Sequence, residues 1–383
     1  MSSNIKVGLL LHFYQPWWQF SHVIKRVADE CYRPILHWID SRPGFAFSAN
    51  VNWSLLELLQ RDGHGDVIDL LKRAVTEGKI ELFGTAAHHP ILPLITAEEI
   101  GRQIERDRQG KRAMGLPLGD GTGIYLPEYA FSPIIVPSLK RAGYSFTVAD
   151  DVLYGAQHRG VPFGTVPRVD GLSVFLRSRQ WGNALAFGQF DFDRFNWQFS
   201  RDVGSWLNGR PGYVILATDG ETFGHHHRHQ IDCLLRPLVD HWSGDGGSAE
   251  ILPFGSLLSI FGPGSEETAV PPSSWSTEPS DFVCGNHFPL WNSPDNIYHR
   301  GLWRLADIAR RYGELPEAAE DVMKLLSSCS WWQVSGRPNF NPRLMVIGAN
   351  KALEIIERVG TDQDRRLGRE AYDSLARLPG VGP

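Results

Sequence analysis

The sequence predicts an α/β fold, an incomplete (β/α)7 barrel followed by a C-terminal helical subdomain. The first observation behind this prediction is that short apolar, β-branched runs alternate with helical stretches over about 240 residues, which is typical of parallel βαβ units. The second is a change of composition after Trp242, where a Pro/Ser-rich stretch at 262–280 leads into helical patterns. We therefore expect a barrel over residues 1–265 and a helical subdomain over residues 266–383.

Seven short apolar runs are expected to form the strands of the barrel. They are residues 6–11, 46–51, 80–83, 123–126, 146–149, 172–176 and 213–217. Amphipathic helices are predicted between several of these runs and after them, because apolar residues recur there at helical spacing. They are residues 66–77, 97–114 and 133–142 in the barrel, and 296–312, 316–327, 344–359 and 361–375 in the C-terminal subdomain.

Polar side chains follow most of the predicted strands at the point where each strand ends. They are His12, Asn52, Glu128, Asp150, Arg177 and Asp219, with His88 and His89 a few positions past the third run. Active sites of α/β barrels are built at the carboxyl ends of the strands. Short polar residues end strands in many proteins, but the whole series favours an active site at this end of the barrel.

The charge and hydropathy of the chain argue against several classes of function. Its 38 Lys and Arg against 43 Asp and Glu give a net charge of −5. No basic block is present, so a nucleic-acid-binding surface has little electrostatic support. No apolar run approaches the roughly 18–20 residues that a membrane-spanning helix needs, and the first residues lack the pattern of a signal peptide. We expect a cytoplasmic protein that binds neither nucleic acid nor membranes.

The four cysteines are scattered along the chain and form no CxxC pair. This pattern favours free thiols in a reducing compartment over a disulfide framework or a zinc site. They are Cys31, Cys233, Cys284 and Cys329.

The aromatic content is high, with 13 Trp, 10 Tyr and 20 Phe. Flat aromatic faces stack on sugar rings, among other ligands, so the excess is a first indication of a carbohydrate site. A single Trp usually belongs to a core, whereas Trp residues clustered beside predicted loops favour a stacking role. The clustered ones are Trp17, Trp18, Trp275, Trp291, Trp331 and Trp332.

Two carboxylates stand out among the strand-end residues. Glu128 follows a short apolar strand that ends at Pro127, where a proline cannot continue a hydrogen-bonded ladder. Asp219 ends the apolar run 213–217 and is followed two residues later by Glu221. A capping role for Glu128 and a solvated acidic turn at Asp219 are the structural alternatives. Two carboxylates from different strand ends match glycoside hydrolysis, where one attacks the anomeric carbon and the other protonates the leaving oxygen.

Histidines accompany both carboxylates. The paired His88 and His89 follow the third strand, and either could hydrogen-bond a sugar hydroxyl. The cluster from His225 to His229 also admits a metal site, since imidazoles together with Asp can hold zinc. Consecutive histidines in a turn do not converge easily on one ion, so we expect no metal.

The combination of these segments resembles glycoside hydrolase family 57. The resemblance extends over nearly the whole chain in the order of the family's motifs. The matching segments are 12–16 (HFYQP), 81–94, 125–128 (YLPE), 219–224 (DGETFG), 275–303 and 330–332 (SWW). Two positions depart from the family pattern: Tyr14 stands in place of the His of His-Gln-Pro, and Tyr125 in place of a Trp. Both keep an aromatic side chain that can hydrogen-bond.

What the resemblance implies is a retaining enzyme that acts on α-glucans or maltooligosaccharides without a cofactor. It implies that Glu128 is the nucleophile, that Asp219 is the general acid/base, and that the helical subdomain completes the substrate groove. The substrate-binding residues it implies are His12, Tyr14, Gln15, Trp17, His88, His89, Tyr125, Glu221, Trp275 and Trp332. Amylase, 4-α-glucanotransferase and branching activities are all compatible with it.

Two alternatives stay open at this point. A metal-dependent polysaccharide deacetylase would hold zinc among Asp219, His225 and the His88/His89 pair. A catalytically silent carbohydrate-binding barrel would bind glucan without turnover, because a fold alone does not guarantee a function.

Overall fold

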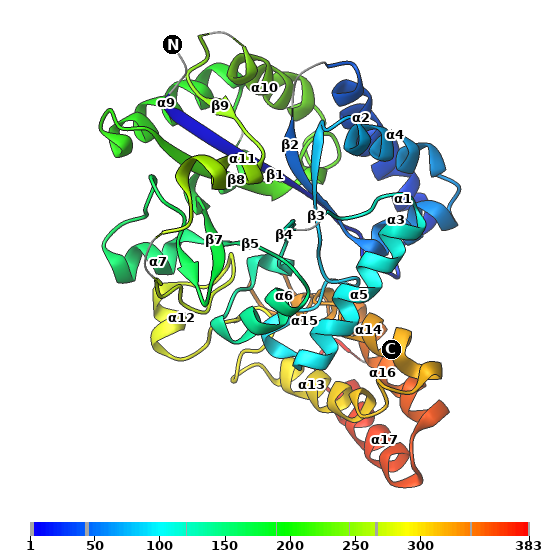
Figure 1. Cartoon of the computed structure of the whole chain (residues 1–383). Helices are drawn as coiled ribbons and strands as arrows, with labels where there is room; N and C mark the ends of the chain where they lie inside the picture. Colours follow the sequence, from blue (N-terminus) through cyan, green and yellow to red (C-terminus); the bar gives the residue numbers. More distant parts are fainter. Residues whose placement is uncertain are drawn as a thin grey trace.

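The computed structural model describes residues 4–42, 46–119, 121–188, 190–244, 246–264, 267–337 and 339–381. At its centre lie seven parallel strands in the spatial order β3-β2-β1-β8-β7-β5-β4 (Figure 1). Their bounds are β1 Ile5–Phe13, β2 Phe47–Val51, β3 Ile80–Phe83, β4 Gly123–Ile124, β5 Phe146–Asp150, β7 Leu172–Arg177 and β8 Gly212–Asp219. All seven predicted strands are therefore confirmed.

The two edge strands of this sheet come together beyond the end of β3. The Gly84 amide donates to the Gly123 carbonyl (3.0 Å), and the Tyr125 amide donates to the Gly84 carbonyl (2.8 Å). Gly84 is required at this contact, because a Cβ there would lie 2.1 Å from the hydroxyl of Tyr144. The seven strands thus nearly close into a barrel, as predicted.

Two further strands of two residues each were not predicted. Strand β6, Arg168–Val169, pairs antiparallel with β7, and β9, Glu250–Ile251, pairs with β1. Strand β4 is shorter than predicted, since the chain leaves the ladder two residues before Pro127.

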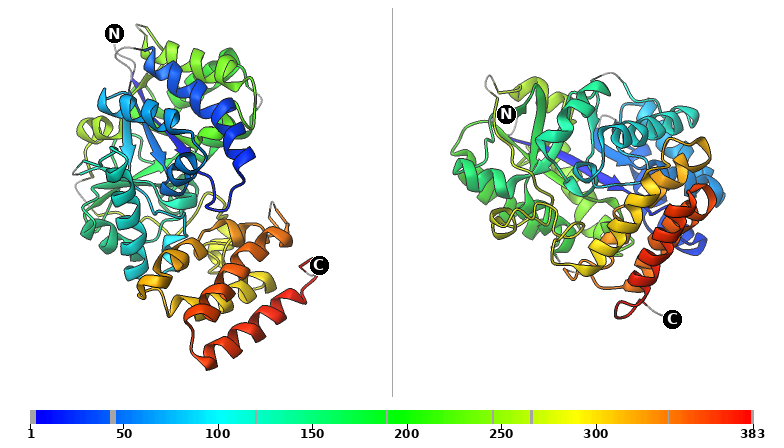
Figure 2. Two further views of the ribbon diagram at one scale, coloured as in Figure 1. Left: turned by 90° about the vertical axis from the view of Figure 1, so that its right-hand side faces the viewer. Right: turned by 90° about the horizontal axis from the view of Figure 1, so that it is seen from below.

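Helices surround the barrel on its outside (Figures 1 and 2). They are α1 Ser21–Val27, α2 Arg33–Asp40, α3 Trp53–Arg61, α4 Gly65–Thr76, α5 Ala97–Ala113, α6 Val136–Arg141, α7 Asp151–His158, α8 Arg179–Phe187, α9 Phe192–Leu207 and α10 Arg236–Ser243. The three barrel helices that the sequence predicts correspond to α4, α5 and α6. Helix α5 begins with a capping box, in which the Thr96 side chain accepts from the Glu99 amide and the Glu99 carboxylate accepts from the Thr96 amide.

Aromatic rings fill the barrel interior. Helix α11, Phe254–Phe261, brings Phe254 into contact with rings from three strands. Its ring centroid lies 5.1 Å from Phe83, 4.9 Å from Phe175 and 6.3 Å from Phe146. The Glu81 carboxylate accepts hydrogen bonds from the backbone amides at the start of α11, which fixes this helix against β3. The interior is therefore a packed core and not a channel.

The chain beyond the barrel is helical, as predicted. It consists of α12 Pro279–Val283, α13 Ile297–Arg310, α14 Pro316–Leu325, α15 Cys329–Trp332, α16 Pro342–Val359 and α17 Asp362–Ala376. Helices α13 to α17 form a second lobe beside the barrel (Figure 2), whereas α12 lies next to α7 (Figure 1). The boundary predicted between residues 265 and 266 lies outside the described residues. None of the helices described is long and apolar enough to cross a membrane.

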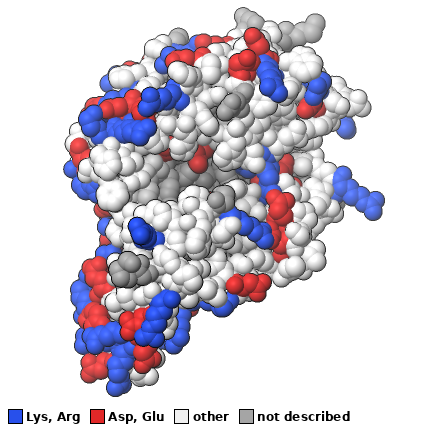
Figure 3. All heavy atoms as spheres, turned by 180° about the vertical axis from the view of Figure 1, so that it is seen from behind, with Lys and Arg blue, Asp and Glu red and all other residues white. Residues whose placement is uncertain are grey.

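Polar contacts join the helical lobe to α5 of the barrel. The Gln103 side chain donates to the Met323 carbonyl (2.9 Å), and Arg310 binds the Glu99 carboxylate. Seen from behind, the surface is hollowed across its middle between the two lobes, and most atoms around this hollow belong to uncharged residues (Figure 3).

Candidate active site

Four aromatic rings, from residues at the ends of three strands, are stacked in a row. The ring of Tyr125 lies 4.1 Å from that of His12, His12 lies 5.1 Å from His89, and His89 lies 4.0 Å from Tyr14, with interplanar angles of 15°, 20° and 14°. We call these four rings the ring stack. His12 is on β1, His89 follows β3 and Tyr125 follows β4, so the structure brings together residues from three of the predicted motifs.

Hydrogen bonds along its edge hold the ring stack in place. His12 Nδ1 lies 2.8 Å from Asn50 Oδ1, and His12 Nε2 lies 3.1 Å from His89 Nε2. His89 Nδ1 in turn lies 3.0 Å from Ser328 Oγ. Burial lowers the pKa of His12 to about 4 and lowers the pKa of His89 as well, so both imidazoles are neutral at neutral pH.

Glu128 lies beside this stack in a largely buried cage. The Trp275 indole N–H donates to Glu128 Oε2 (2.6 Å), and Ser328 Oγ lies 3.4 Å from Glu128 Oε1. Only 20% of the Glu128 side chain is exposed. Burial raises the pKa of Glu128 to about 7; the hydrogen bond from Trp275 opposes this shift and the charge of Asp219 adds to it.

The backbone at Glu128 is in an unusual conformation. Glu128 and Tyr129 have φ angles of 60° and 51°, in the left-handed region that non-glycine residues rarely adopt. Such residues persist where the surrounding structure holds them, and they cluster at functional sites. Here the conformation turns the chain sharply after Pro127 and places the Glu128 carboxylate within hydrogen-bonding distance of the Trp275 N–H.

Asp219 ends β8 directly opposite His12 in the register of the two strands. It is exposed, whereas the seven preceding residues of β8 are buried. Its charge raises the pKa values of both Glu128 and Glu221 and opposes the lowering of the pKa of His12. The two predicted catalytic carboxylates therefore share one electrostatic environment, one of them buried and the other open to solvent.

Glu221 follows Asp219 by two residues and is buried. Its Oε1 accepts from the Tyr32 hydroxyl (2.5 Å) and from the Tyr14 amide (3.1 Å). Burial raises the pKa of Glu221 to about 8, with the charge of Asp219 as the second cause. The side chain thereby fixes the loop that carries Tyr14.

Contacts of Arg177 support the ring of Tyr129, the residue that follows Glu128 in the chain. The guanidinium of Arg177 lies 5.0 Å from the centre of the Tyr129 ring and binds the Asp150 carboxylate (3.1 Å). Arg177 also donates to the Ala217 carbonyl (2.9 Å). Two of the strand-end residues noted in the sequence thus position Tyr129.

The other residues implied to bind substrate lie in different surroundings. His88 is buried and its Nε2 lies 2.9 Å from Glu320 Oε1 on α14, so the structure does not bring it into the ring stack. Gln15 is buried and accepts from Gln19 (2.8 Å). Trp17 and Trp332 are partly buried, and Lys351 of α16 lies over the ring of Trp17 at 5.3 Å.

The interpretation of two tryptophans as possible stacking platforms was wrong. Trp291 and Trp331 are 0% and 1% exposed and belong to the core of the helical lobe. The Trp303 ring packs against Trp331 at 4.4 Å, and its N–H donates to the Trp291 carbonyl. Their position beside predicted loops did not reveal that both side chains pack into the core of the helical lobe.

The histidine cluster after β8 is not arranged around one point. His225 Nδ1 lies 2.7 Å from Glu30 Oε2, while His227 Nε2 lies 3.2 Å from the Ala186 carbonyl. Among the described residues, no three His, Cys, Asp or Glu side chains lie in positions that could hold a metal ion. The donor set that the deacetylase alternative requires is therefore not assembled in this part of the chain.

Sequence reasoning missed two residues at the site, Asn50 and Ser328. Asn50 lies inside β2 opposite His12 in register, and the polar Ser48 and Asn50 in an otherwise apolar strand were the available signal. Ser328 follows α14 and carried no signal in the sequence, because its contacts with His89 and Glu128 are long-range.

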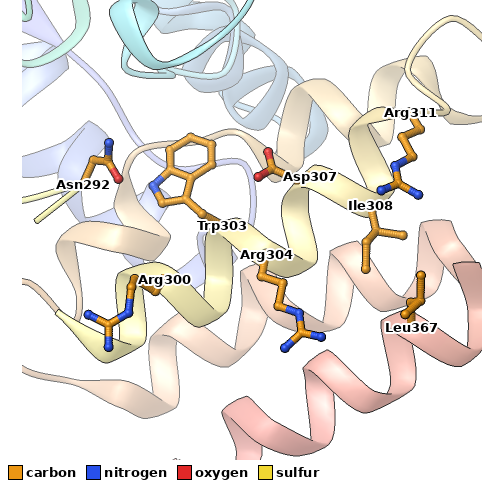
Figure 4. A pocket seen from close by; sticks show the side chains of 8 residues that line it. All are labelled: Asn292, Arg300, Trp303, Arg304, Asp307, Ile308, Arg311 and Leu367. Carbon is orange, nitrogen blue, oxygen red and sulfur yellow. The ribbon is translucent and has the colours of Figure 1, made fainter. Parts of the chain in front are cut away.

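A separate hollow of about 560 Å³ lies on the outer side of the helical lobe (Figure 4). Three arginines, Arg300, Arg304 and Arg311, line it together with Trp303 and Asp307. None of its lining residues belongs to the ring stack or contacts Glu128, so the chemistry described above is not located there.

Comparison with known proteins agrees with these features. Residues 10–241 match the profile of Glycosyl hydrolase family 57, which is more than half of the chain. An α-amylase of Pyrococcus horikoshii is 31% identical over 141 residues, which are 37% of this chain and 22% of that protein. A 4-α-glucanotransferase of Thermococcus kodakarensis is 28% identical over 221 residues, 56% of this chain and 32% of that protein. The chain thus spans about a fifth to a third of these relatives' length.

Solved structures show the same fold. The 4-α-glucanotransferase from Thermococcus litoralis superposes with a TM-score of 0.72 at 19% identity, over 94% of this chain and 60% of that one. The GH57-type branching enzyme from Pyrococcus horikoshii superposes with a TM-score of 0.68 at 16% identity, over 99% of this chain and 96% of that one. With the profile match over the barrel, these findings show that the chain belongs to glycosyl hydrolase family 57.

Proposed function

We propose that the protein is a retaining enzyme acting on α-1,4-glucans, with Glu128 as the nucleophile and Asp219 as the general acid/base. The observation that carries this proposal is the pair of carboxylates after β4 and at the end of β8, coupled electrostatically but placed in opposite surroundings. Similar proteins are named α-amylase and 4-α-glucanotransferase, which supports the α-glucan as substrate.

The different surroundings of the two carboxylates support these roles. An acid/base must exchange its proton with an incoming water or sugar hydroxyl, and Asp219 is open to solvent. Glu128 is held by Trp275 and Ser328 at a fixed position, as an attacking group must be. Its raised pKa by itself favours the reverse assignment, because the buried carboxyl of such a pair is usually the acid. The positive charge that develops on the anomeric carbon offsets this, since it stabilises the ionised carboxylate in the transition state.

In the first step the Glu128 carboxylate attacks the anomeric carbon while Asp219 protonates the leaving glycosidic oxygen. In the second step Asp219 removes a proton from the acceptor, which attacks the glycosyl-enzyme and releases Glu128. Water as acceptor gives hydrolysis, and a glucan hydroxyl gives transfer or branching. We further propose that residues 1–265 form the catalytic barrel and that residues 266–383 complete the groove, since Trp275 and Ser328 reach Glu128 from beyond the barrel strands.

Incubation with amylose and maltotriose, followed by analysis of product length and linkage, tests the activity. Shorter chains alone mean hydrolysis, longer chains as well mean transfer, and new 1,6-links mean branching. Glucan binding with no product after long incubation refutes the enzyme and leaves a binding protein.

Azide rescue tests which carboxylate has which role. With an aryl α-maltotrioside as substrate, azide should restore turnover to Asp219→Asn through the glycosyl-enzyme and give the α-glycosyl azide. In Glu128→Gly, azide takes the place of the carboxylate and should give the β-glycosyl azide. The opposite pairing of anomers means that the two roles are exchanged, and unaltered turnover in Glu128→Gln or Asp219→Asn refutes the assigned role.

A further inference from the structure

An unbroken line of hydrogen-bonding groups leads from Glu128 into the barrel wall. Glu128 Oε1 lies 3.4 Å from Ser328 Oγ, and Ser328 Oγ lies 3.0 Å from His89 Nδ1. His89 Nε2 lies 3.1 Å from His12 Nε2, and His12 Nδ1 lies 2.8 Å from Asn50 Oδ1. Apart from Glu128, every member is at most 3% exposed. We call these five residues the Glu128–Asn50 chain.

Counting protons shows how the members of this chain depend on one another. The Asn50 carbonyl oxygen accepts, so His12 must carry a proton on Nδ1. A neutral His12 then has a bare Nε2, and His89 must donate to it from its own Nε2. A neutral His89 has a bare Nδ1, which the Ser328 hydroxyl must satisfy. The only hydroxyl proton of Ser328 is then used, and the Glu128 oxygen facing it is best satisfied when Glu128 is protonated.

Moving one proton along the chain gives a second, equally complete arrangement. If His12 is an imidazolium, it donates from Nδ1 to Asn50 and from Nε2 to His89. His89 then donates from Nδ1 to Ser328, and Ser328 donates to Glu128, which is ionised. Both arrangements contain the same number of protons, and every hydrogen bond is made in each.

We propose that Ser328 and His89 relay a proton from Glu128 to His12, and that Asn50 is the positioning residue that makes His12 able to accept it. The Glu128 O–H bond breaks as a new Ser328 O–H bond forms, and the original Ser328 proton passes to His89 Nδ1. The proton on His89 Nε2 passes to His12 Nε2. No proton enters or leaves, and the products are the Glu128 carboxylate and the His12 imidazolium.

Other groups decide how easily His12 takes the charge. Burial is the largest influence and lowers the pKa of His12 to about 4, and the charge of Lys111 acts in the same direction. Asp219, opposite His12 in register, and the hydrogen bond to Asn50 favour the imidazolium. The groups that face the two ends of the chain from neighbouring elements are Tyr14, Lys111, Tyr125, Tyr129, Asp219, Trp275 and Cys329. Of these, Asp219 is the carboxylate placed to stabilise a charge on His12.

This inference deepens the proposed function and rests on it, because it explains how a buried nucleophile becomes ionised. A bound glucan keeps bulk water from Glu128, so the proton of this carboxyl needs an acceptor inside the protein. The relay provides one at His12, between Tyr125 and His89 in the ring stack.

The test measures the protonated fraction of Glu128 directly. The carboxyl C=O band in infrared spectra is assigned to Glu128 by its loss in Glu128→Gln. It is recorded at about pH 8, above the pKa of this group, where most of the wild-type carboxyl is ionised and a rise in its pKa strengthens the band. The sample is the full chain with a maltotriose whose glycosidic oxygens are replaced by sulfur, so that no turnover occurs. We expect the band to be at least about twofold stronger in Asn50→Leu and in Ser328→Ala than in the wild type. The acidic limb of kcat on maltotriose should move to higher pH in both variants, by about half a unit or more.

Asn50 carries the decisive comparison, because it does not touch Glu128. Asn50→Asp places a carboxylate against His12 and should weaken the Glu128 band below that of the wild type, opposite to Asn50→Leu. In the Ser328→Ala background the bridging hydroxyl is gone and His89 Nδ1 is left 3.6 Å from Glu128 Oε1, so Asn50→Leu should have a smaller effect there than in the wild type. Ser328→Thr keeps the hydroxyl and should restore the wild-type band. Ser327→Ala removes a neighbouring buried hydroxyl, which binds Tyr14, and should leave the band unchanged.

The relay is overturned if the Glu128 band is unchanged in both Asn50 variants. It is also overturned if Asn50→Leu changes the band by the same factor in the wild type and in Ser328→Ala. The infrared band needs no turnover. If Glu128→Gln retains activity, the proposed function fails while the relay is still tested.

Discussion

Replacing Glu128 by glutamine should stabilise the protein, and more so at higher pH. The pKa of Glu128 is raised from the ordinary 4.5 to about 7 in the folded chain, mainly by burial. Between these two values the unfolded chain releases its proton while the folded chain keeps it, so the stability of the wild type falls as pH rises. Each pKa unit is worth about 1.4 kcal/mol, so the full penalty is about 3 kcal/mol above the folded pKa and vanishes below the unfolded one.

Glutamine has nearly the same shape and cannot ionise. Its side-chain oxygen can still accept from Trp275, so the variant keeps this hydrogen bond. We expect the gain in free energy of unfolding from Glu128→Gln to be about 2.5 kcal/mol larger at about pH 8 than at about pH 5. The assay is urea unfolding followed by tryptophan fluorescence at both pH values.

A matched control is Glu314→Gln, whose wild-type side chain is 82% exposed. Its free energy of unfolding should stay within about 0.5 kcal/mol of the wild type at both pH values. An equal effect of Glu128→Gln at the two pH values, or a larger gain at the lower pH, would refute the argument that burial penalises this carboxylate.

Two further substitutions test the geometry around the carboxylates. A Cβ on Gly220 would lie 2.1 Å from the ring of Phe13, so Gly220→Ala should destabilise the protein by about 1–3 kcal/mol and lower kcat. Gly65→Ala, where no atom lies within 4 Å of the new Cβ, is its control in thermal unfolding and should be near neutral. The N–H of Trp275 donates to Glu128, and this hydrogen bond lowers the pKa of Glu128. Trp275→Phe removes the hydrogen bond and should raise this pKa, so the acidic limb of kcat/KM should move to higher pH by about one unit. An unmoved limb would mean that this hydrogen bond does not control the ionisation of Glu128.

The strands could be predicted because each barrel strand is buried on both faces and therefore appears as a continuous apolar run. The polar residues at their ends were informative for the same reason, since His12, Glu128 and Asp219 interrupt that pattern where the barrel opens. Two-residue strands such as β6 and β9 carry no such pattern and were missed.

The contacts between side chains at the site could not be predicted. Trp275 and Ser328 lie 147 and 200 residues from Glu128 along the chain, and nothing local marks them as its hydrogen-bond donors. Asn50 could be suspected only once the register between β1 and β2 placed it opposite His12. His88 shows the reverse case: its neighbour His89 joins the ring stack, while His88 itself binds Glu320.

The backbone conformations explain why local rules fail at this site in particular. Among the described residues, six non-glycine positions have a left-handed φ. Arg159 and Asn208 terminate helices, and Asp170 turns the chain between β6 and β7, so these three have local reasons. The other three, His89, Glu128 and Tyr129, follow β3 and β4 and carry side chains of the site. Glu128 and Tyr129 are the central residues of a turn that the Ala130 amide closes on the Pro127 carbonyl (3.0 Å), and side chains other than glycine cost conformational energy there. A buried carboxylate adds a further cost at neutral pH. A fold selected for stability alone would retain neither, so the strain and the buried charge at one place are independent physical arguments that this end of the barrel is the active site.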